Sequence, residues 1–192
     1  PFSEEQGGLG GGHTDLSLIF EEFGKAIVVE PYLANVVLAG GVLKRSNLEN
    51  ADELIAGIVS GETQISLANY EPMKGFNLDN IDATISSDGQ INGTKSTVLN
   101  AGNADHFLVF GKTGDGYAFG LVNRSSDGVK VVNYKTYDGF VSGDLVLENC
   151  KCDAVFSVEN ALEILEETIL DAIVCVSSEA VGAMEKSYKL TI

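Results

Sequence analysis

The hydrophobic periodicity of this 192-residue chain changes twice, and the two changes limit what the chain can fold into. Up to about residue 62, and again from about residue 154, apolar residues recur at the spacing of amphipathic helices. Between residues 63 and 153, short β-rich runs alternate with turn signals instead. We therefore expect an α+β fold with a helical segment at 1–62, a central antiparallel β-barrel or sandwich at 63–153 and a long helix at 154–192.

Three helices are predicted in the first segment, at about residues 14–24, 31–45 and 51–59. Thr14 is a suitable N-cap for the first helix, and Gly24 is a suitable C-cap. The second helix is strongly apolar and is closed electrostatically by Lys44 and Arg45, so we expect it to be buried on most sides.

The middle segment should contain roughly seven short strands. Its β-rich runs are Gln64 to Ala68, Asp82 to Ser86, Phe107 to Lys112, Tyr117 to Asn123, Val129 to Tyr134 and Gly143 to Leu147. Glycine-containing sequences at 87–90, 92–93, 114–116 and 126–128 are typical of hairpin turns, because glycine adopts positive φ without strain.

Composition excludes some partners. The formal net charge is −16, from 28 acidic and 12 basic residues, and phosphate backbones are bound by Lys and Arg, so we expect no nucleic-acid partner. No apolar run approaches the length of about 20 residues that spans a bilayer, so no membrane partner is expected. The cysteines Cys150, Cys152 and Cys175 form no paired framework and no zinc motif, which favours reduced thiols in a cytoplasmic protein.

Two candidate catalytic or phosphate motifs fail on inspection. The glycine-rich stretch at residues 7–12 has no preceding strand and no following Lys-Ser/Thr, so it is a helix lead-in and not a phosphate loop. His13 and His106 lie near no nucleophile signature, and we expect both to be structural or solvent-exposed.

Two acidic groups of residues leave alternatives open. A stripe on the last helix is either a solvated face or a contact for a basic partner: Glu159, Glu163, Glu166 and Glu167. A second group offers oxygen ligands for calcium but lacks the spacing of a calcium loop, so turn formation is the preferred interpretation: Asn77, Asp79, Asn80 and Asp82.

Several stretches, in the same order, resemble the acyl-CoA dehydrogenase family. Residues 1–10, PFSEEQGGLG, resemble its P-x-x-E-x-G-G-L-G motif, and residues 20–26, FEEFGKA, follow. Residues 91–95, INGTK, are similar to its L-N-G-x-K hairpin, and residues 179–184, EAVGAM, to part of its long helix. Residues 29–34 and the helix entering 179–182 look most like the small subunits of two-component members, such as the pimeloyl-CoA dehydrogenase small subunit.

The resemblance covers essentially the whole chain and implies three domain segments. Residues 1–62 would end the family's N-terminal helical domain, residues 63–153 would form its middle β-domain, and residues 154–192 would begin a truncated C-terminal helical bundle. The chain starts at Pro1 without Met and stops in an uncapped helical pattern at Ile192, which indicates a fragment.

The resemblance also implies FAD as the cofactor. The family's flavin loop, T-E-P-G-x-G-S-D, corresponds to residues 70–77, YEPMKGFN, where the family's Glu, Pro and one Gly are retained. Tyr70 and Phe76 replace hydroxyl residues of that loop, and Leu99 replaces a hydroxyl of the second flavin stretch, which weakens the expected FAD contacts. The predicted cofactor contacts are Leu67, Asn69, Tyr70, Gly75, Phe76, Thr97, Val98 and Leu99.

In the family, a carboxylate removes the α-proton of an acyl thioester while the β-hydride passes to the flavin. That carboxylate lies in later helices, so no catalytic residue is predicted in this chain, and no metal ligand either. The first hypothesis is that the chain is part of an FAD-dependent acyl-CoA dehydrogenase of fatty-acid metabolism. This enzyme would act on an acyl-CoA or acyl-carrier-protein thioester within a homo-oligomer. The alternative is a flavin-poor, non-catalytic subunit that complements a larger homologous subunit. A free-standing β-barrel binding module is a third possibility, and the apolar flanking helices argue against it.

Overall fold

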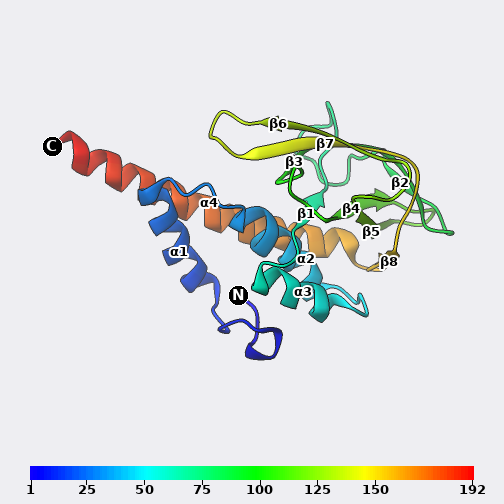
Figure 1. Ribbon diagram of the computed structural model, residues 1–192, viewed down its shortest axis with the longest axis horizontal. Coiled ribbons are helices and arrows are strands. Elements are labelled where there is room, and N and C mark those ends of the chain that lie inside the picture. Colours follow the sequence, from blue (N-terminus) through cyan, green and yellow to red (C-terminus); the bar gives the residue numbers. More distant parts are fainter.

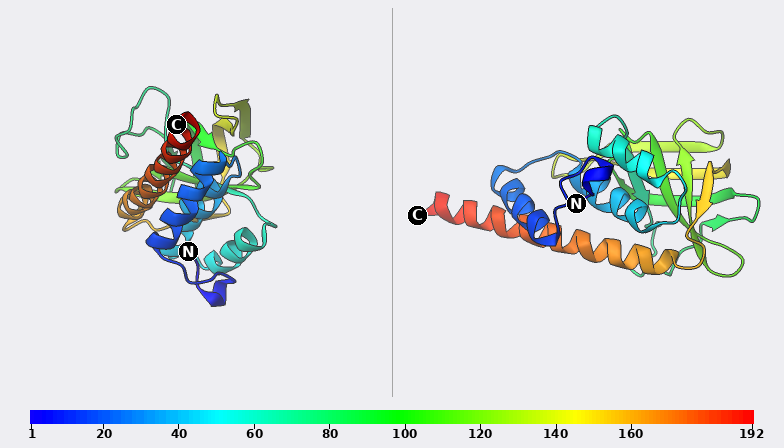
Figure 2. Two further views of the ribbon diagram at one scale, coloured as in Figure 1. Left: turned by 90° about the vertical axis from the view of Figure 1, so that its left-hand side faces the viewer. Right: turned by 90° about the horizontal axis from the view of Figure 1, so that it is seen from below.

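The computed structural model describes residues 1–192 and contains a helical layer beside a β-sheet (Figure 1). The helices are η1 (Glu4–Gln6), α1 (His13–Ala26), the π-helix η2 (Leu33–Ala39), α2 (Gly40–Arg45), α3 (Ala51–Ser60) and α4 (Ala161–Thr191). In Figure 2, α4 runs along one side of the fold, and its last turns extend past the other elements. None of the helices combines the length and the apolar character that crossing a membrane requires.

Eight strands form one mostly antiparallel sheet, which confirms the predicted α+β class. They are β1 (Ile65–Ala68), β2 (Thr84–Ile85), β3 (Gln90–Leu99), β4 (His106–Lys112), β5 (Tyr117–Asn123), β6 (Val129–Lys135), β7 (Val141–Lys151) and β8 (Ala154–Phe156). The strand order is β6-β7-β3-β2-β4-β5-β8, with β1 paired to β4 off this path. The sheet is not closed into a barrel, and the β1–β4 and β2–β4 pairs are parallel.

Two hydrophobic clusters hold the fold together. The larger one joins the helices to the sheet, with Phe20, Leu43, Ile55 and Leu165 from the helices. The smaller one gathers side chains from β1 to β5 and from β7, with Phe107 wholly buried in it. Each fully buried large apolar side chain contributes about 1.5–3 kcal/mol, so the helix–sheet cluster makes the helices and the sheet mutually dependent.

The first predicted helix ends differently from the prediction. The chain leaves α1 at Ile27, which adopts φ 52, so the predicted cap Gly24 lies inside the helix. Gly24 instead faces α4, where a methyl group added to it would lie 1.9 Å from the carbonyl oxygen of Glu179. Gly182 approaches Glu21 of α1 equally closely, so glycine permits backbone-to-backbone packing of α1 and α4.

Two predictions about the β segment were wrong. Asn92 and Gly93 do not form a turn, because both lie inside β3, which pairs with β7 and shifts register at this point. The helical pattern does not begin at about residue 154, because Ala154–Phe156 pair with β5 as the strand β8 and the helix starts at Ala161. The second and third predicted helices are confirmed, and Gly61 caps the third at φ 78.

One histidine and one acid of the acidic stripe form ion pairs within the chain. His13 Nε2 lies 2.8 Å from Asp171 Oδ1 on α4, and His106 begins β4. Arg45 of α2 binds two acids of α4, with Nε 2.9 Å from Glu167 Oε2 and Nη2 2.7 Å from Asp171 Oδ2. The other three acids of the stripe are exposed. One of its members, Glu167, is therefore paired within the chain.

Candidate functional site

The two stretches predicted to contact a cofactor lie side by side, at the ends of β1 and β3. The backbone N–H of Ser96 donates to the carbonyl oxygen of Tyr70 at 2.9 Å. Between Lys95 and Val98 the register of β3 against β7 shifts, and Thr97 adopts φ 54 there. A bulge of this kind redirects side chains, and it turns Thr97 outward while Val98 stays buried.

A buried ion pair anchors this arrangement. Lys95 Nζ lies 2.7 Å from Glu71 Oε1, and the two side chains are 0% and 4% exposed. The carboxylate also accepts from the backbone N–H groups of Asp82, at 2.6 Å, and Ala83, at 2.9 Å. Glu71 therefore joins the start of the loop at residues 71–83, its end, and β3.

Burial disfavours the charged Glu71 carboxylate, but the bond from Lys95 and the two backbone N–H donors outweigh it, so the pKa of Glu71 lies below its usual value. Burial lowers the pKa of Lys95, against the carboxylate bond that raises it. We take the pair as charged, because the carboxylate has three donors within 2.9 Å and the Lys95 ammonium has an acceptor at 2.7 Å.

The loop that follows Glu71 presents apolar side chains to solvent. Phe76 is 88% exposed and packs its ring edge-on against Tyr70, with ring centroids 6.0 Å apart. Gly75 adopts φ 71, and Met73 is fully exposed. The one cation of the loop, Lys74, is engaged by Asp82 at 2.7 Å. The backbone N–H of Lys74 donates to the carbonyl oxygen of Glu71, and that of Asn80 to the carbonyl oxygen of Asn77, which are bonds of turns, as the turn interpretation of the Asn and Asp residues predicted.

Hydrogen-bond donors at the strand ends are partly used. The backbone N–H of Thr97 donates to Asp144 Oδ1 at 3.2 Å, and the Tyr134 hydroxyl donates to the same oxygen at 3.1 Å. Asn69 is 8% exposed, and its Nδ2 is buried without a partner. Leu67 is buried in the core between helices and sheet. Asn69 is thus a predicted contact residue whose buried side-chain donor is unused.

A cavity of about 640 Å³ lies between the sheet and the helices. Its walls come from α1, the segment at residues 27–34, the end of β3, the β6–β7 hairpin and α4. Of the eight predicted contact residues, Thr97 and Leu99 line this cavity and the other six do not. Its volume lies within the usual range of small-molecule sites, which are mostly apolar with a few polar groups.

Sequence reasoning missed most of the cavity wall. Phe20, Phe23 and Tyr32 line it and contact one another, with ring centroids 5.5–5.9 Å apart. Glu179 lines it from α4, and burial together with the charge of Asp138 raises the pKa of its carboxyl. The sequence places these residues on helix faces or in a family motif, and no local pattern brings them together.

Comparison with known proteins gives relatives for the whole chain. No protein-family model matches it. Acryloyl-CoA reductase (NADH) of Anaerotignum propionicum is 22% identical over 207 residues, which cover 98% of this chain and 52% of that protein. The chain therefore spans about half the length of this curated relative.

Solved structures give the same coverage. Butyryl-CoA dehydrogenase of Megasphaera elsdenii matches 96% of this chain and 54% of its own at 22% identity, with a TM-score of 0.84. The FAD complex of PigA matches 100% and 55% at 21% identity, with a TM-score of 0.91. The ChsE4-ChsE5 complex from Mycobacterium tuberculosis matches 98% and 51% at 26% identity, with a TM-score of 0.83.

Proposed function

We propose that this chain, whose fold is that of the acyl-CoA dehydrogenases over the half of their length that it spans, is part of an FAD-dependent enzyme that oxidises an acyl thioester between its α and β carbons. The family resemblance expected from the motifs is confirmed at the level of the fold. The domain limits 1–62, 63–153 and 154–192 and the cytoplasmic location stay predictions.

One observation carries the proposal: part of the second predicted flavin stretch forms the wall of the apolar cavity. Thr97 and Leu99 lie on the sheet side of the cavity, opposite apolar residues of α1 and α4. A flexible acyl chain is stabilised by such a wall at about 25 cal/mol per Å² of apolar surface removed from water. The cavity can thus hold an acyl chain beside the strand ends where a flavin ring would lie.

FAD fits the strand ends better than it fits the loop. A flavin ring presents oxygen and nitrogen acceptors, and the unused Nδ2 donor of Asn69 suits one of them. A pyrophosphate needs cations, hydroxyls or free N–H groups, whereas Lys74 is engaged by Asp82 and Phe76 offers a phenyl ring. Asn69, Thr97 and Leu99 would therefore hold the ring, and the phosphates would depend on groups outside residues 71–79.

The chemistry that FAD supplies when bound is acceptance of a hydride. The residues of this chain would orient the acyl chain and exclude water from it, which is the role of Phe23, Tyr32 and Leu99 in the cavity wall. The α-proton requires a carboxylate base, and none is assigned within these 192 residues.

A flavin-poor subunit that complements a larger homologue is the second candidate. The observation that favours it is the loop at residues 71–79, where Met73 and Phe76 are exposed and Lys74 is paired. An exposed apolar loop of this kind suits a protein contact. The ChsE4-ChsE5 structure shows that a protein of this fold occurs in a complex with another chain.

The visible absorption spectrum of the full-length protein, purified without added flavin, separates the two candidates. Flavin bands at about one FAD per chain, with reduction by an acyl-CoA, would support the dehydrogenase. We then expect Asn69→Ala to weaken FAD binding by up to roughly tenfold, because one hydrogen bond is lost. The exposed Asn133→Ala, on β6 and outside the cavity, is the matched control. A protein that stays colourless after FAD is added would support the complementing subunit.

A further inference from the structure

We propose that the cavity binds an acyl group that carries a fixed or protonated positive charge at its far end, such as a quaternary amine. This inference rests on the proposed function, because it assumes that the cavity holds the acyl part of a thioester. The aromatic and acidic side chains that line the cavity indicate this class of substrate.

Aromatic rings form one part of that wall. Phe20, Phe23 and Tyr32 contact one another pairwise, with interplanar angles of 55°, 73° and 80°. Phe140 from the β6–β7 hairpin also lines the cavity. Aromatic faces attract cations, and quaternary ammonium groups are bound by groups of such rings.

The charges of the wall have one sign. Glu30, Asp138 and Glu179 line the cavity, and no Lys, Arg or His does. Asp138 is engaged at the hairpin by the Thr136 hydroxyl and the backbone N–H of Phe140. Glu179 has no such partner, and burial raises the pKa of its carboxyl. A ligand cation would supply the missing counter-charge, whereas an anionic acyl group would face three acidic side chains and no cation.

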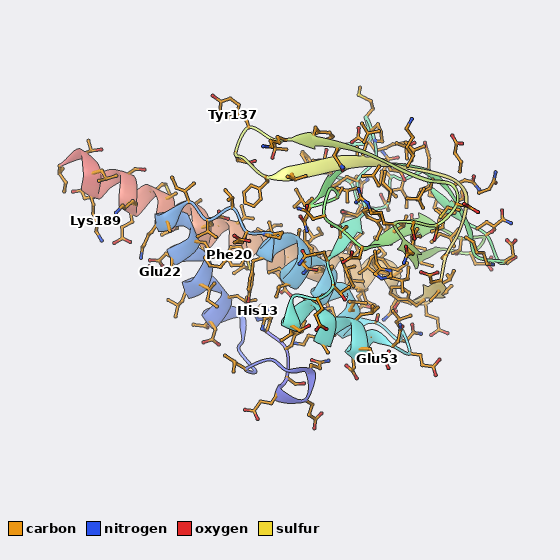
Figure 3. All side chains as sticks on the ribbon, in the orientation of Figure 1. His13, Phe20, Glu22, Glu53, Tyr137 and Lys189 are labelled. Carbon is orange, nitrogen blue, oxygen red and sulfur yellow. The ribbon has the colours of Figure 1, made fainter.

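The arrangement also gives the ligand a direction. Thr97 and Leu99 stand on the sheet side of the cavity, and Glu179 stands on the helix side together with the rings of Phe20, Phe23 and Tyr32. Figure 3 shows Phe20 on α1, on the side that faces α4. The thioester end therefore belongs beside Thr97 and the charged end beside Glu179.

Binding of two isosteric thioesters to the full-length protein, measured by isothermal titration calorimetry, tests the inference. One is trimethylammoniobutyryl-CoA, and the other carries carbon in place of the nitrogen, so that only the charge differs. We expect the charged thioester to bind roughly tenfold more tightly. Glu179→Gln should remove most of this preference, and Glu166→Gln, an exposed site on the same helix outside the cavity, should keep it.

A second variant guards against a folding defect. Phe23→Leu keeps an apolar side chain but removes the aromatic face, so we expect it to weaken binding of the charged thioester more than binding of the neutral one. Equal binding of the two thioesters to the wild type would overturn this inference and leave the proposed function standing. Binding of neither thioester would overturn both.

Discussion

The buried ion pair between Lys95 and Glu71 gives the sharpest stability prediction. In Lys95→Met, an apolar side chain of similar length replaces the ammonium and leaves a 4% exposed carboxylate without its counter-charge. Breaking such a pair from one side costs about 3–5 kcal/mol, of which the two backbone donors to Glu71 recover part. We therefore expect a loss of about 3 kcal/mol in the free energy of unfolding, measured by urea denaturation.

The double variant Lys95→Met/Glu71→Gln should recover at least about 1 kcal/mol of that loss, because the carboxamide removes the stranded charge and keeps an acceptor for one of the two backbone donors. Lys130→Met, an exposed site on β6, is the control and should change the free energy by less than about 0.5 kcal/mol. A loss below about 1 kcal/mol in Lys95→Met would refute a charged, stabilising pair.

The pair also contributes to the pH dependence of the free energy of unfolding at acidic pH. The pKa of Glu71 is lower in the folded protein than in the unfolded chain, so its contribution is full above the unfolded value, near 4.3, and disappears as the pH falls through the folded value. Glu71→Gln lacks this group. The stability difference between wild type and this variant should therefore shrink steadily below about pH 4.5.

Three further predictions concern helix packing, thiols and a surface network. Gly24→Ala should destabilise the protein by about 1–3 kcal/mol in thermal unfolding, because α1 and α4 must separate, whereas Gly114→Ala, with open space around it, should be neutral. Burial raises the pKa of Cys152 and Cys175 to about 11, so alkylation at pH 8 should be slower than in urea by roughly two orders of magnitude; equal rates would contradict the buried thiols. Arg45→Met should cost about 1 kcal/mol, since both ion pairs to α4 are part-exposed, and an unchanged urea midpoint would show that they contribute nothing.

Local sequence patterns predicted the end of α3 correctly, but they placed the N-cap of α1 at Thr14, whereas Gly12 is the N-cap. The helix α3 ends where Gly61 adopts φ 78, a conformation that glycine alone adopts without strain. Gly24 was wrongly predicted to cap α1. It permits the close approach of α4, about 155 residues further along the chain, and no local pattern contains that contact. The turn at Asn92-Gly93 was wrongly predicted for the same reason, since the pairing of β3 with β7 overrides the turn preference of these two residues.

The candidate site could be predicted only in part. The family motifs pointed to the strand ends, where the hydrogen bond between Ser96 and Tyr70 joins the two stretches. The cavity was not predictable, because residues such as Tyr32 and Glu179 line it from segments far apart in the sequence. Helical spacing gives the face on which a side chain lies, but it gives no information about the element that will pack opposite.

The close contact of α1 with α4 has a mechanical consequence for the cavity. Backbone atoms touch at Gly24 and Gly182, so α1 and α4 form a rigid wall of the cavity. The cavity cannot widen on this side without breaking the packing of the two helices. The opposite wall is the β6–β7 hairpin, which lies at the sheet edge and carries the fully exposed Tyr137 at its tip (Figure 3). We expect bulkier ligands to be accommodated by bending of this hairpin, which hydrogen exchange of residues 129–141 would register while α1 stays protected.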